Sequence, residues 1–129
     1  MTVTTQLDFD KSAGMLPVIV RHARQGDVLM LGYMNRAAWE QTLATGWVTF
    51  FSRSRQRLWL KGETSGNRLR LVRAFTDCDG DALLVEAEFE GQPAVCHEGY
   101  RGCFFRAWRD GRFQVEGERV FDPGEVYAQ

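Results

Sequence analysis

The alternation of apolar and polar residues predicts two short strands near the start of the chain. An apolar run at residues 18–20 follows Pro17, and a longer apolar run covers residues 28–33. The polar residues 25–27 between them include Gly26 and are typical of a turn. The first part of the chain is therefore expected to fold as two strands joined by a tight connection.

A helix is predicted over residues 36–45, where the pattern changes. Trp39 and Leu43 are four residues apart, so both lie on one face of such a helix. Asn35 is a suitable N-cap because its side chain can accept a hydrogen bond from the first turn. Gly46 is a suitable C-terminal stop because glycine adopts the left-handed backbone conformation easily.

After Gly46 the pattern is that of β-structure. Aromatic and β-branched residues, alternation and turn residues such as Asp110-Gly111 predict strands at residues 47–51, 57–60, 69–75, 82–89, 104–108 and 112–115. The predicted fold class is therefore α+β, mostly antiparallel β-sheet with one clear helix.

Length and composition indicate one globular domain. The chain has 129 residues, of which 44% are hydrophobic, enough for a single core. We expect one domain over residues 1–129, ending in a polar, loosely held tail at 116–129. No apolar run approaches the roughly 20 residues of a membrane-spanning helix, and the first residues lack the features of a signal peptide. We therefore expect a cytoplasmic protein that does not bind membranes.

Charge is distributed unevenly although the net charge is only −1, which argues against nucleic acid as a partner. Residues 53–73 contain seven basic side chains and one acidic one, whereas residues 77–90 contain six acidic side chains and no basic one. The first segment favours phosphates and the second favours cations. Both segments are also compatible with solvated strand faces that have no ligand.

Side chains that commonly bind metals are concentrated between residues 77 and 103. This segment holds all three cysteines of the chain, one of its two histidines and three closely spaced aspartates: Asp77, Cys78, Asp79, Asp81, Cys96, His97 and Cys103. Thiolates prefer zinc, whereas carboxylates prefer magnesium, calcium or manganese. The segment therefore offers ligands for a soft metal and for a hard metal.

The aspartates alternate with other residues, so in extended backbone Asp77, Asp79 and Asp81 point the same way. Three like charges on one face repel each other unless a cation lies between them. An EF-hand calcium loop is the obvious formal match, but it requires glycine at its sixth position, where this chain has Ala82. The residues that follow also resemble a strand and not the required helix.

The cysteines leave three alternatives open. Cys96 and Cys103 are separated by more residues than in common zinc-finger knuckles, and three cysteines complete a structural zinc site only if His97 is the fourth ligand. Three protein ligands with an open position would instead be a catalytic site. Unligated thiols that only pack in the core are the third alternative.

Several strings of residues resemble one enzyme family, phosphoribosyl-AMP cyclohydrolase. The resemblance extends over about residues 14–106 and is carried by residues 28–35, 51–55, 59–67, 77–81 with 83–85, and 96–104. Lys-Gly-Glu-Thr-Ser-Gly-Asn at 61–67 and Asp-Cys-Asp-Gly-Asp at 77–81 are its most specific parts. The chain departs from the family pattern at Gly102, where we expect serine.

The resemblance implies an intertwined homodimer with zinc shared across the interface. Cys78 of one subunit would join Cys96 and Cys103 of the other, and Asp77, Asp79 and Asp81 would bind magnesium. The implied reaction is hydrolytic opening of the N1–C6 bond in the adenine ring of phosphoribosyl-AMP, the third step of histidine biosynthesis. It is similar to the attack of zinc-bound hydroxide on a ring carbon in zinc deaminases.

A proton acceptor and a phosphate site complete the hypothesis. His97 is the candidate base because it adjoins Cys96 and because histidine is the side chain whose unperturbed pKa, about 6.5, lies closest to neutral pH. The small polar side chains and backbone N–H groups at residues 63–67 are suited to binding an anion. The predicted substrate-binding residues are Ser52, Arg53, Lys61, Glu63, Thr64, Ser65 and Asn67.

Two non-enzymatic alternatives remain at this point. The chain could be a dimer in which zinc only joins the subunits. It could also be an RNA-binding module in which Phe50, Phe51 and Trp59 stack on bases beside Arg53 and Arg55. The aspartate cluster argues against the second alternative, because it would repel a nucleic-acid backbone.

Overall fold

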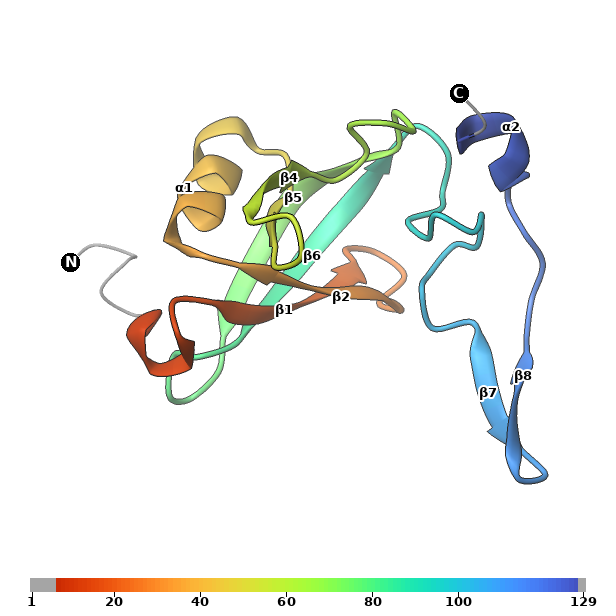
Figure 1. The fold of residues 1–129 in the computed structure, drawn as a ribbon, viewed down its shortest axis with the longest axis horizontal. Helices are drawn as coiled ribbons and strands as arrows, with labels where there is room; N and C mark the ends of the chain where they lie inside the picture. Colours follow the sequence, from red (N-terminus) through yellow and green to blue (C-terminus); the bar gives the residue numbers. More distant parts are fainter. Residues whose placement is uncertain (1–6, 128–129) are drawn as a thin grey trace.

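The structure of the chain, a computed structural model, describes residues 7–127. Its centre is a sheet with the strand order β2-β1-β6-β5, in which β1 and β6 run parallel and the other neighbours antiparallel (Figure 1). Its strands are β1 (Leu16–His22), β2 (Val28–Met34), β5 (Arg68–Thr76) and β6 (Leu83–Glu90). No helix within residues 7–127 is both long and apolar enough to cross a bilayer.

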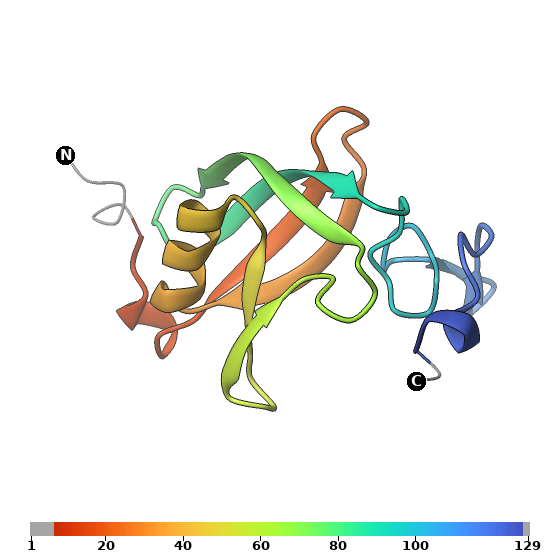
Figure 2. The same ribbon diagram turned by 90° about the horizontal axis from the view of Figure 1, so that it is seen from above.

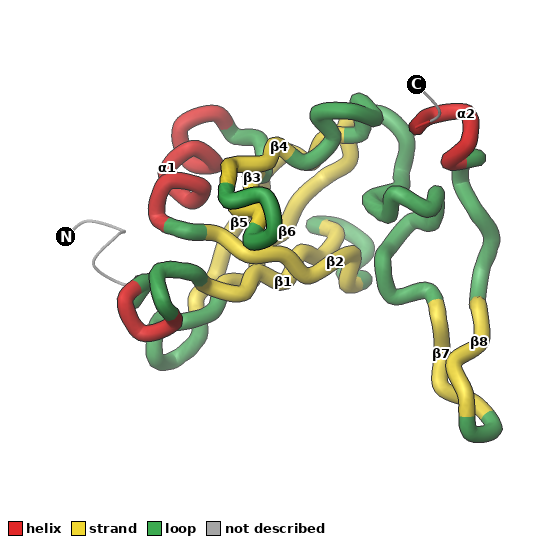
Figure 3. Tube along the Cα trace, viewed as in Figure 1, coloured by secondary structure: helices red, strands yellow, loops and turns green. Residues whose placement is uncertain are grey.

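Within the described residues, two hairpins and three helical segments complete the fold (Figure 3). The hairpins are β3 (Thr49–Ser52) with β4 (Arg57–Leu60) and β7 (Arg106–Arg109) with β8 (Arg112–Val115). The helical segments are the 3-10 turn η2 (Asp10–Ser12), α1 (Arg36–Thr45) and α2 (Pro123–Tyr127). The predicted α+β class with mostly antiparallel sheet is confirmed, whereas α2 is a helix that the sequence pattern does not predict.

Helix α1 begins and ends where its capping residues predict. The Asn35 side chain accepts a hydrogen bond of 2.9 Å from the backbone N–H of Ala38. Gly46 adopts a left-handed conformation with φ of 83°, and its N–H donates to the carbonyl of Thr42. Both ends of the helix therefore satisfy backbone groups that would otherwise lack partners.

The buried face of α1 consists of Ala38, Trp39 and Thr42, whereas Leu43 is exposed. The Thr42 hydroxyl donates to the carbonyl of Ala38 and accepts from the N–H of Thr49, which fixes the helix against β3. Figure 2 shows α1 beside the β3–β4 hairpin on one side of the sheet. The core beneath them contains Leu16, Val18, Val20, Phe50, Leu69 and Val85, all almost fully buried. Each such side chain stabilises the fold by about 1.5–3 kcal/mol.

Strand β6 lies between β1 and β5 and connects the two segments that carry potential metal ligands. The acidic loop at residues 77–81 precedes β6, and the cysteine loop at residues 96–103 follows it. At about 3.3 Å per residue, the strand separates the two loops by roughly 25 Å. Figures 1 and 2 agree that the loops lie at opposite ends of the sheet.

The basic and acidic segments of the sequence neutralise each other across β5 and β6. Arg73 pairs with Glu86 at 2.9 Å and Arg70 pairs with Glu88 at 2.7 Å. Arg21 of β1 also pairs with Glu86, at 2.7 Å. Arg21 and Arg73 together hold the pKa of the Glu86 carboxyl below its ordinary value. This part of the basic segment is therefore occupied by internal ion pairs and does not form a free basic surface.

The second half of β5 differs from the half-buried strand that its alternation predicts. The pairing of β5 with β6 shifts between Leu71 and Arg73, which indicates a bulge. Leu69, before the bulge, is buried in the core, but Val72 and Phe75 are exposed. Apolar surface therefore remains uncovered next to the acidic loop.

The C-terminal tail is attached to the cysteine loop, so the expectation that it is loosely held is wrong for residues 119–121. The guanidinium of Arg119 donates to the carbonyl of Glu98, and the N–H of Val120 donates to the carbonyl of Gly99. Phe121 is buried. Gly99 has φ of 94° and a Cβ there would lie 2.2 Å from the Phe121 carbonyl oxygen, so this contact requires glycine.

The β7–β8 hairpin projects away from the sheet (Figure 1). Its turn, Asp110-Gly111, has positive φ at both residues, as the sequence predicts for a tight hairpin. Trp108 and Phe113 pack edge to face against each other, yet they are 63% and 64% exposed. The hairpin therefore presents aromatic surface that no other part of residues 7–127 covers.

The cysteine loop is also fixed to the turn between β1 and β2. Arg101 donates to both carboxylate oxygens of Asp27, at 2.8 and 3.1 Å, and to the side chain of Gln25. The N–H of Cys103 donates to the carbonyl of Leu29 at 2.7 Å. A Cβ at Gly102 would lie 3.2 Å from the same carbonyl oxygen, so the loop approaches β2 closely there.

The ion pair between Asp27 and Arg101 predicts a pH-dependent loosening of the cysteine loop. The hydrogen bond from Arg101 lowers the pKa of Asp27 from the ordinary 3.8. The ion pair therefore stabilises the folded protein fully above pH 3.8, and this stabilisation is lost as the pH falls through the lower pKa that Asp27 has in the folded state. We expect amide-exchange protection of residues 96–103 to fall in that range relative to β6. Because exposed ion pairs contribute only about 0–1 kcal/mol, global stability should change little.

Hydrogen exchange of the Asp27→Asn variant provides the control. It should show low protection of residues 96–103 at neutral pH and no further specific loss on acidification. Arg109→Met, which removes a charge from the β7–β8 hairpin, should leave the loop protected. Wild-type protection in Asp27→Asn would contradict this account of the loop.

Candidate active site

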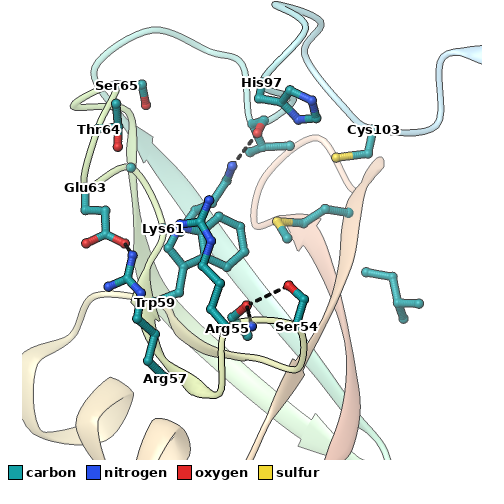
Figure 4. Close-up of a pocket in the computed structure, with 15 residues that line it drawn as sticks. Ser54, Arg55, Arg57, Trp59, Lys61, Glu63, Thr64, Ser65, His97 and Cys103 are labelled. Carbon is teal, nitrogen blue, oxygen red and sulfur yellow. Dashed lines mark hydrogen bonds and ion pairs between the residues drawn. The ribbon is translucent and has the colours of Figure 1, made fainter. Parts of the chain in front are cut away.

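A cavity of about 620 Å³ lies between β2, the β3–β4 hairpin, the loop after β4 and the cysteine loop (Figure 4). Its volume is in the range of small-molecule sites, about 300–1,000 Å³. The cavity brings together segments from residues 30–31, 52–65 and 95–103. Its walls therefore join the basic segment of the sequence to the cysteine loop.

Most of the side chains predicted for substrate binding and catalysis line this cavity. They are Ser52, Lys61, Glu63, Thr64, Ser65 and His97, and the predicted zinc ligand Cys103 also lines the cavity. In Figure 4, His97 and Cys103 lie on one side of the cavity and Glu63, Thr64 and Ser65 on the other. A molecule in the cavity would therefore contact the cysteine loop and the loop after β4 at the same time.

Arg53 and Asn67 lie elsewhere. The guanidinium of Arg53 stacks on the ring of Tyr33, 3.9 Å from its centroid, in a neighbouring groove. Asn67 is buried, and its side-chain oxygen accepts a hydrogen bond from the N–H of Gln92. Asn67 therefore braces the loop after β4 against the segment that follows β6.

Three prominent residues of the cavity are absent from the set predicted for the substrate. Arg55, Arg57 and Trp59 all line it. Arg57 also pairs with Glu63, at 3.7 Å. Arg57 and Trp59 share parity with Lys61, so the alternation of β4 puts all three on one face. That alternation is the sequence signal that could have identified Arg57 and Trp59, whereas Arg55 lies in the turn before β4.

The thiols of Cys96 and Cys103 are neighbours in the cysteine loop. Cys96 is buried and its sulfur accepts a hydrogen bond from the N–H of Glu98 at 3.4 Å. Cys103 as a whole is exposed, but its thiol is largely shielded from water. This desolvation, with a smaller contribution from Cys96, raises the pKa of the Cys103 thiol to about 11. Two adjacent thiols fit zinc, which binds thiolates and displaces their protons.

Within the described part of the chain, these two thiols have no third ligand side chain close enough to complete a metal site. Among residues 7–127, the one group of three or more potential ligand side chains with close donor atoms consists of Asp77, Asp79 and Asp81. His97 therefore does not complete a trio with Cys96 and Cys103. Cys78 is exposed in the acidic loop, at the other end of β6.

Two aspartates of the acidic loop are paired with the ammonium group of Lys11 from the same chain. Carboxylate oxygens of Asp77, Asp79 and Asp81 lie within 4.8 Å of one another. The ammonium of Lys11 lies 3.1 Å from Asp79 and 3.3 Å from Asp81. Lys11 lowers the pKa of Asp79, whereas the proximity of Asp79 raises the pKa of Asp81. The arrangement fits a hard cation, and the strand that follows confirms that this is not an EF-hand.

Lys61 is buried between the cavity and the cysteine loop. Its ammonium donates a hydrogen bond to the backbone carbonyl of Val95 and lies 5.3 Å from the centroid of the Trp59 ring. Burial lowers the pKa of Lys61, and the nearby thiols of Cys103 and Cys96 oppose that shift. Its position thus differs from that of an exposed lysine at the rim of a phosphate site.

Comparisons with known proteins agree with the resemblance in the sequence. The family model of phosphoribosyl-AMP cyclohydrolase matches residues 30–105. Among curated proteins of that name, the one from Solibacter usitatus is 51% identical over 122 residues, which cover 95% of this chain and 96% of the relative.

Other relatives with the same name also cover nearly the whole chain. The protein of Pelotomaculum thermopropionicum is 54% identical over 118 residues, 91% of this chain and 90% of the relative. That of Desulfatibacillum aliphaticivorans is 49% identical over 124 residues, 96% of this chain and 98% of the relative. The chain therefore belongs to the phosphoribosyl-AMP cyclohydrolase family.

Proposed function

We propose that this enzyme hydrolyses the N1–C6 bond in the adenine ring of 1-(5-phosphoribosyl)-AMP. The product is the phosphoribosyl-formimino-aminoimidazole-carboxamide nucleotide, formed in the third step of histidine biosynthesis. The observation that supports this most strongly is the cavity of about 620 Å³, which joins His97 and Cys103 to a polar, arginine-bearing wall. Family membership gives the substrate class, and the cavity gives a place of suitable size and chemistry.

The polar wall suits a substrate with two phosphates and a purine. Arg55 and Arg57 can pair with phosphate oxygens, and the backbone N–H groups of Thr64 and Ser65 can donate to them. The Trp59 ring offers a flat surface to the purine. In this proposal Ser52, Thr64 and Ser65 add hydroxyl groups, while Arg53 and Asn67 hold the neighbouring backbone.

Zinc would be held by Cys96 and Cys103 of one chain together with Cys78 of a second copy. The separation of the acidic and cysteine loops by β6 supports a shared site, because no single chain brings its three cysteines together. Bound by these thiolates, zinc would polarise a water molecule and lower its pKa toward neutrality. Asp77, Asp79 and Asp81 would hold magnesium, whose charge can balance substrate oxygens.

Exposed apolar side chains adjoin both halves of the proposed zinc site. Phe104, directly after Cys103, is 68% exposed, and Phe75 is exposed three residues before Cys78. Trp108 and Phe113 of the projecting hairpin add further aromatic surface. Contiguous exposed apolar surface is typical of interaction sites. A homodimer that joins the two half-sites would cover both groups of side chains at once.

His97 is the proposed proton carrier. As the oxygen of water bonds to C6, the imidazole of His97 takes one proton from that water. It then returns a proton to N1 as the C6–N1 bond breaks, so that water is added across the bond without net loss of a proton. His97 suits this role because it lies in the cavity wall beside the cysteine loop.

The direct test is turnover of the substrate by the purified enzyme. With zinc and magnesium supplied, the ultraviolet absorbance should change as the purine ring opens, and removal of zinc by a chelator should abolish the change. An RNA-binding module or a dimer merely stapled by zinc would produce no turnover. Absence of ring opening in fully metallated, folded protein would refute the proposed function.

Replacement of His97 tests the proton carrier. His97→Ala should retain zinc and lower turnover at least tenfold, because general base catalysis typically contributes about 10²–10⁴-fold. Glu98→Gln, a change at the next position whose side chain faces Arg106 at 3.8 Å, is the matched control and should keep nearly full turnover. Full turnover by His97→Ala with full zinc content would remove His97 from the mechanism.

Mixing two inactive variants tests the shared site. Cys78→Ser and Cys103→Ser should each be inactive alone. In a twofold symmetric dimer, a mixed pair rebuilds one intact site, so random exchange of subunits should recover about one quarter of wild-type activity. If each zinc were bound within one chain, mixing would recover nothing, and the shared site would be wrong.

A further inference from the structure

Lys61 is the one lysine or arginine that is buried among residues 7–127, with 8% of its surface exposed. Burying an ammonium group is costly unless it finds partners that replace water. The cavity does not depend on Lys61 for positive charge, because its wall already contains Arg55 and Arg57. The position of Lys61 therefore calls for a specific partner.

The partner is the cysteine loop. Lys61 extends from the end of β4, and its ammonium donates to the carbonyl of Val95, the residue directly before Cys96 (Figure 4). Lys61 also lines the cavity together with Cys103 and His97. One side chain thus connects the β3–β4 hairpin to the segment that carries two thiols.

Because the ammonium bonds to the residue next to Cys96 and shares the cavity with Cys103, both thiols lie within electrostatic reach of its charge. Its nearest aromatic neighbour is Trp59, whose ring attracts cations. A zinc ion bound by three thiolates carries a net charge of about −1. In a desolvated site that charge is unfavourable unless a positive group lies nearby.

We propose that Lys61 is a positioning residue for the zinc half-site, which fixes the cysteine loop through Val95 and balances the charge of the Cys96 and Cys103 thiolates. This rests on the proposed function, because it assumes that these thiols hold a metal. It gives Lys61 a role different from phosphate binding. Phosphates are left to Arg55, Arg57 and the backbone N–H groups of Thr64 and Ser65.

Cobalt binding tests this role without any measurement of activity. Co²⁺ replaces zinc at thiolate sites, and its sulfur-to-metal charge-transfer absorption reports thiolate ligands. Wild type, Lys61→Met, Lys61→Arg and the control Arg55→Met would be titrated with Co²⁺ under reducing, anaerobic conditions, after thermal melts have shown that each is folded. Arg55→Met removes a charge from the same cavity without touching the cysteine loop.

Lys61→Met should bind Co²⁺ about 10- to 100-fold more weakly, the usual effect of losing a group that supports metal ligands. Its charge-transfer band should also move to longer wavelength, because removing a nearby positive charge makes the sulfur electrons easier to transfer. Lys61→Arg should restore part of the affinity and the position of the band. Arg55→Met should behave like wild type in both measurements.

Wild-type affinity in folded Lys61→Met would overturn the proposal. A loss of affinity that Lys61→Arg does not restore, with an unmoved band, would also overturn it, because Lys61 would then only fill space. If Lys61→Met does not fold, Lys61→Gln takes its place, and equal affinities of the Gln and Arg variants would refute the role of charge. If wild type itself shows no sulfur-to-cobalt band, the zinc site of the proposed function fails, not the role of Lys61 alone.

Discussion

Strand β6 imposes the spacing on which the rest of this molecule depends. It is hydrogen-bonded to β1 on one side and to β5 on the other, and its inward side chains, Val85 and Ala87, belong to the core. A strand held in this way cannot shorten or bend enough to bring its ends together. The acidic loop with Cys78 and the cysteine loop with Cys96 and Cys103 are therefore fixed at opposite ends of the sheet. A chemistry that needs all three thiols has to be assembled from more than one copy.

Pairing between strands also decides which charges are available for function. The arginines of β5 face the glutamates of β6, and Glu86 is shared by Arg73 and Arg21. These groups satisfy one another and have no need of a ligand. The positive charges that remain around the cavity are Arg55, the buried Lys61 and Arg57, which lies beside Glu63. Internal pairing thus divides one basic segment of the sequence into a structural part and a part that faces the cavity.

Features that depend on neighbouring residues could be predicted from the sequence. The bounds of α1 follow from Asn35 and Gly46, and the turn of the β7–β8 hairpin follows from Asp110-Gly111. In each case the deciding hydrogen bond or backbone angle lies within a few residues. The cavity residues of the motif at 61–65 were predicted for the same reason, because one short loop carries them together.

Features that depend on distant contacts could not be predicted. The parallel pairing of β1 with β6 joins segments about half the chain apart, and no local pattern specifies it. The alternation of β5 suggested a half-buried strand, but a bulge leaves Val72 and Phe75 exposed. The burial of Lys61 likewise results from the cysteine loop that packs over it, although composition alone favours an exposed lysine.

The central claim is that zinc joins Cys96 and Cys103 of one chain to Cys78 of another. A crystal structure of the protein purified with its metal, with anomalous diffraction recorded on both sides of the zinc absorption edge, tests this most directly. The account predicts one anomalous peak per chain, contacted by Cys96 and Cys103 of that chain and by Cys78 of a second copy. A zinc peak whose protein ligands all come from a single chain would contradict it.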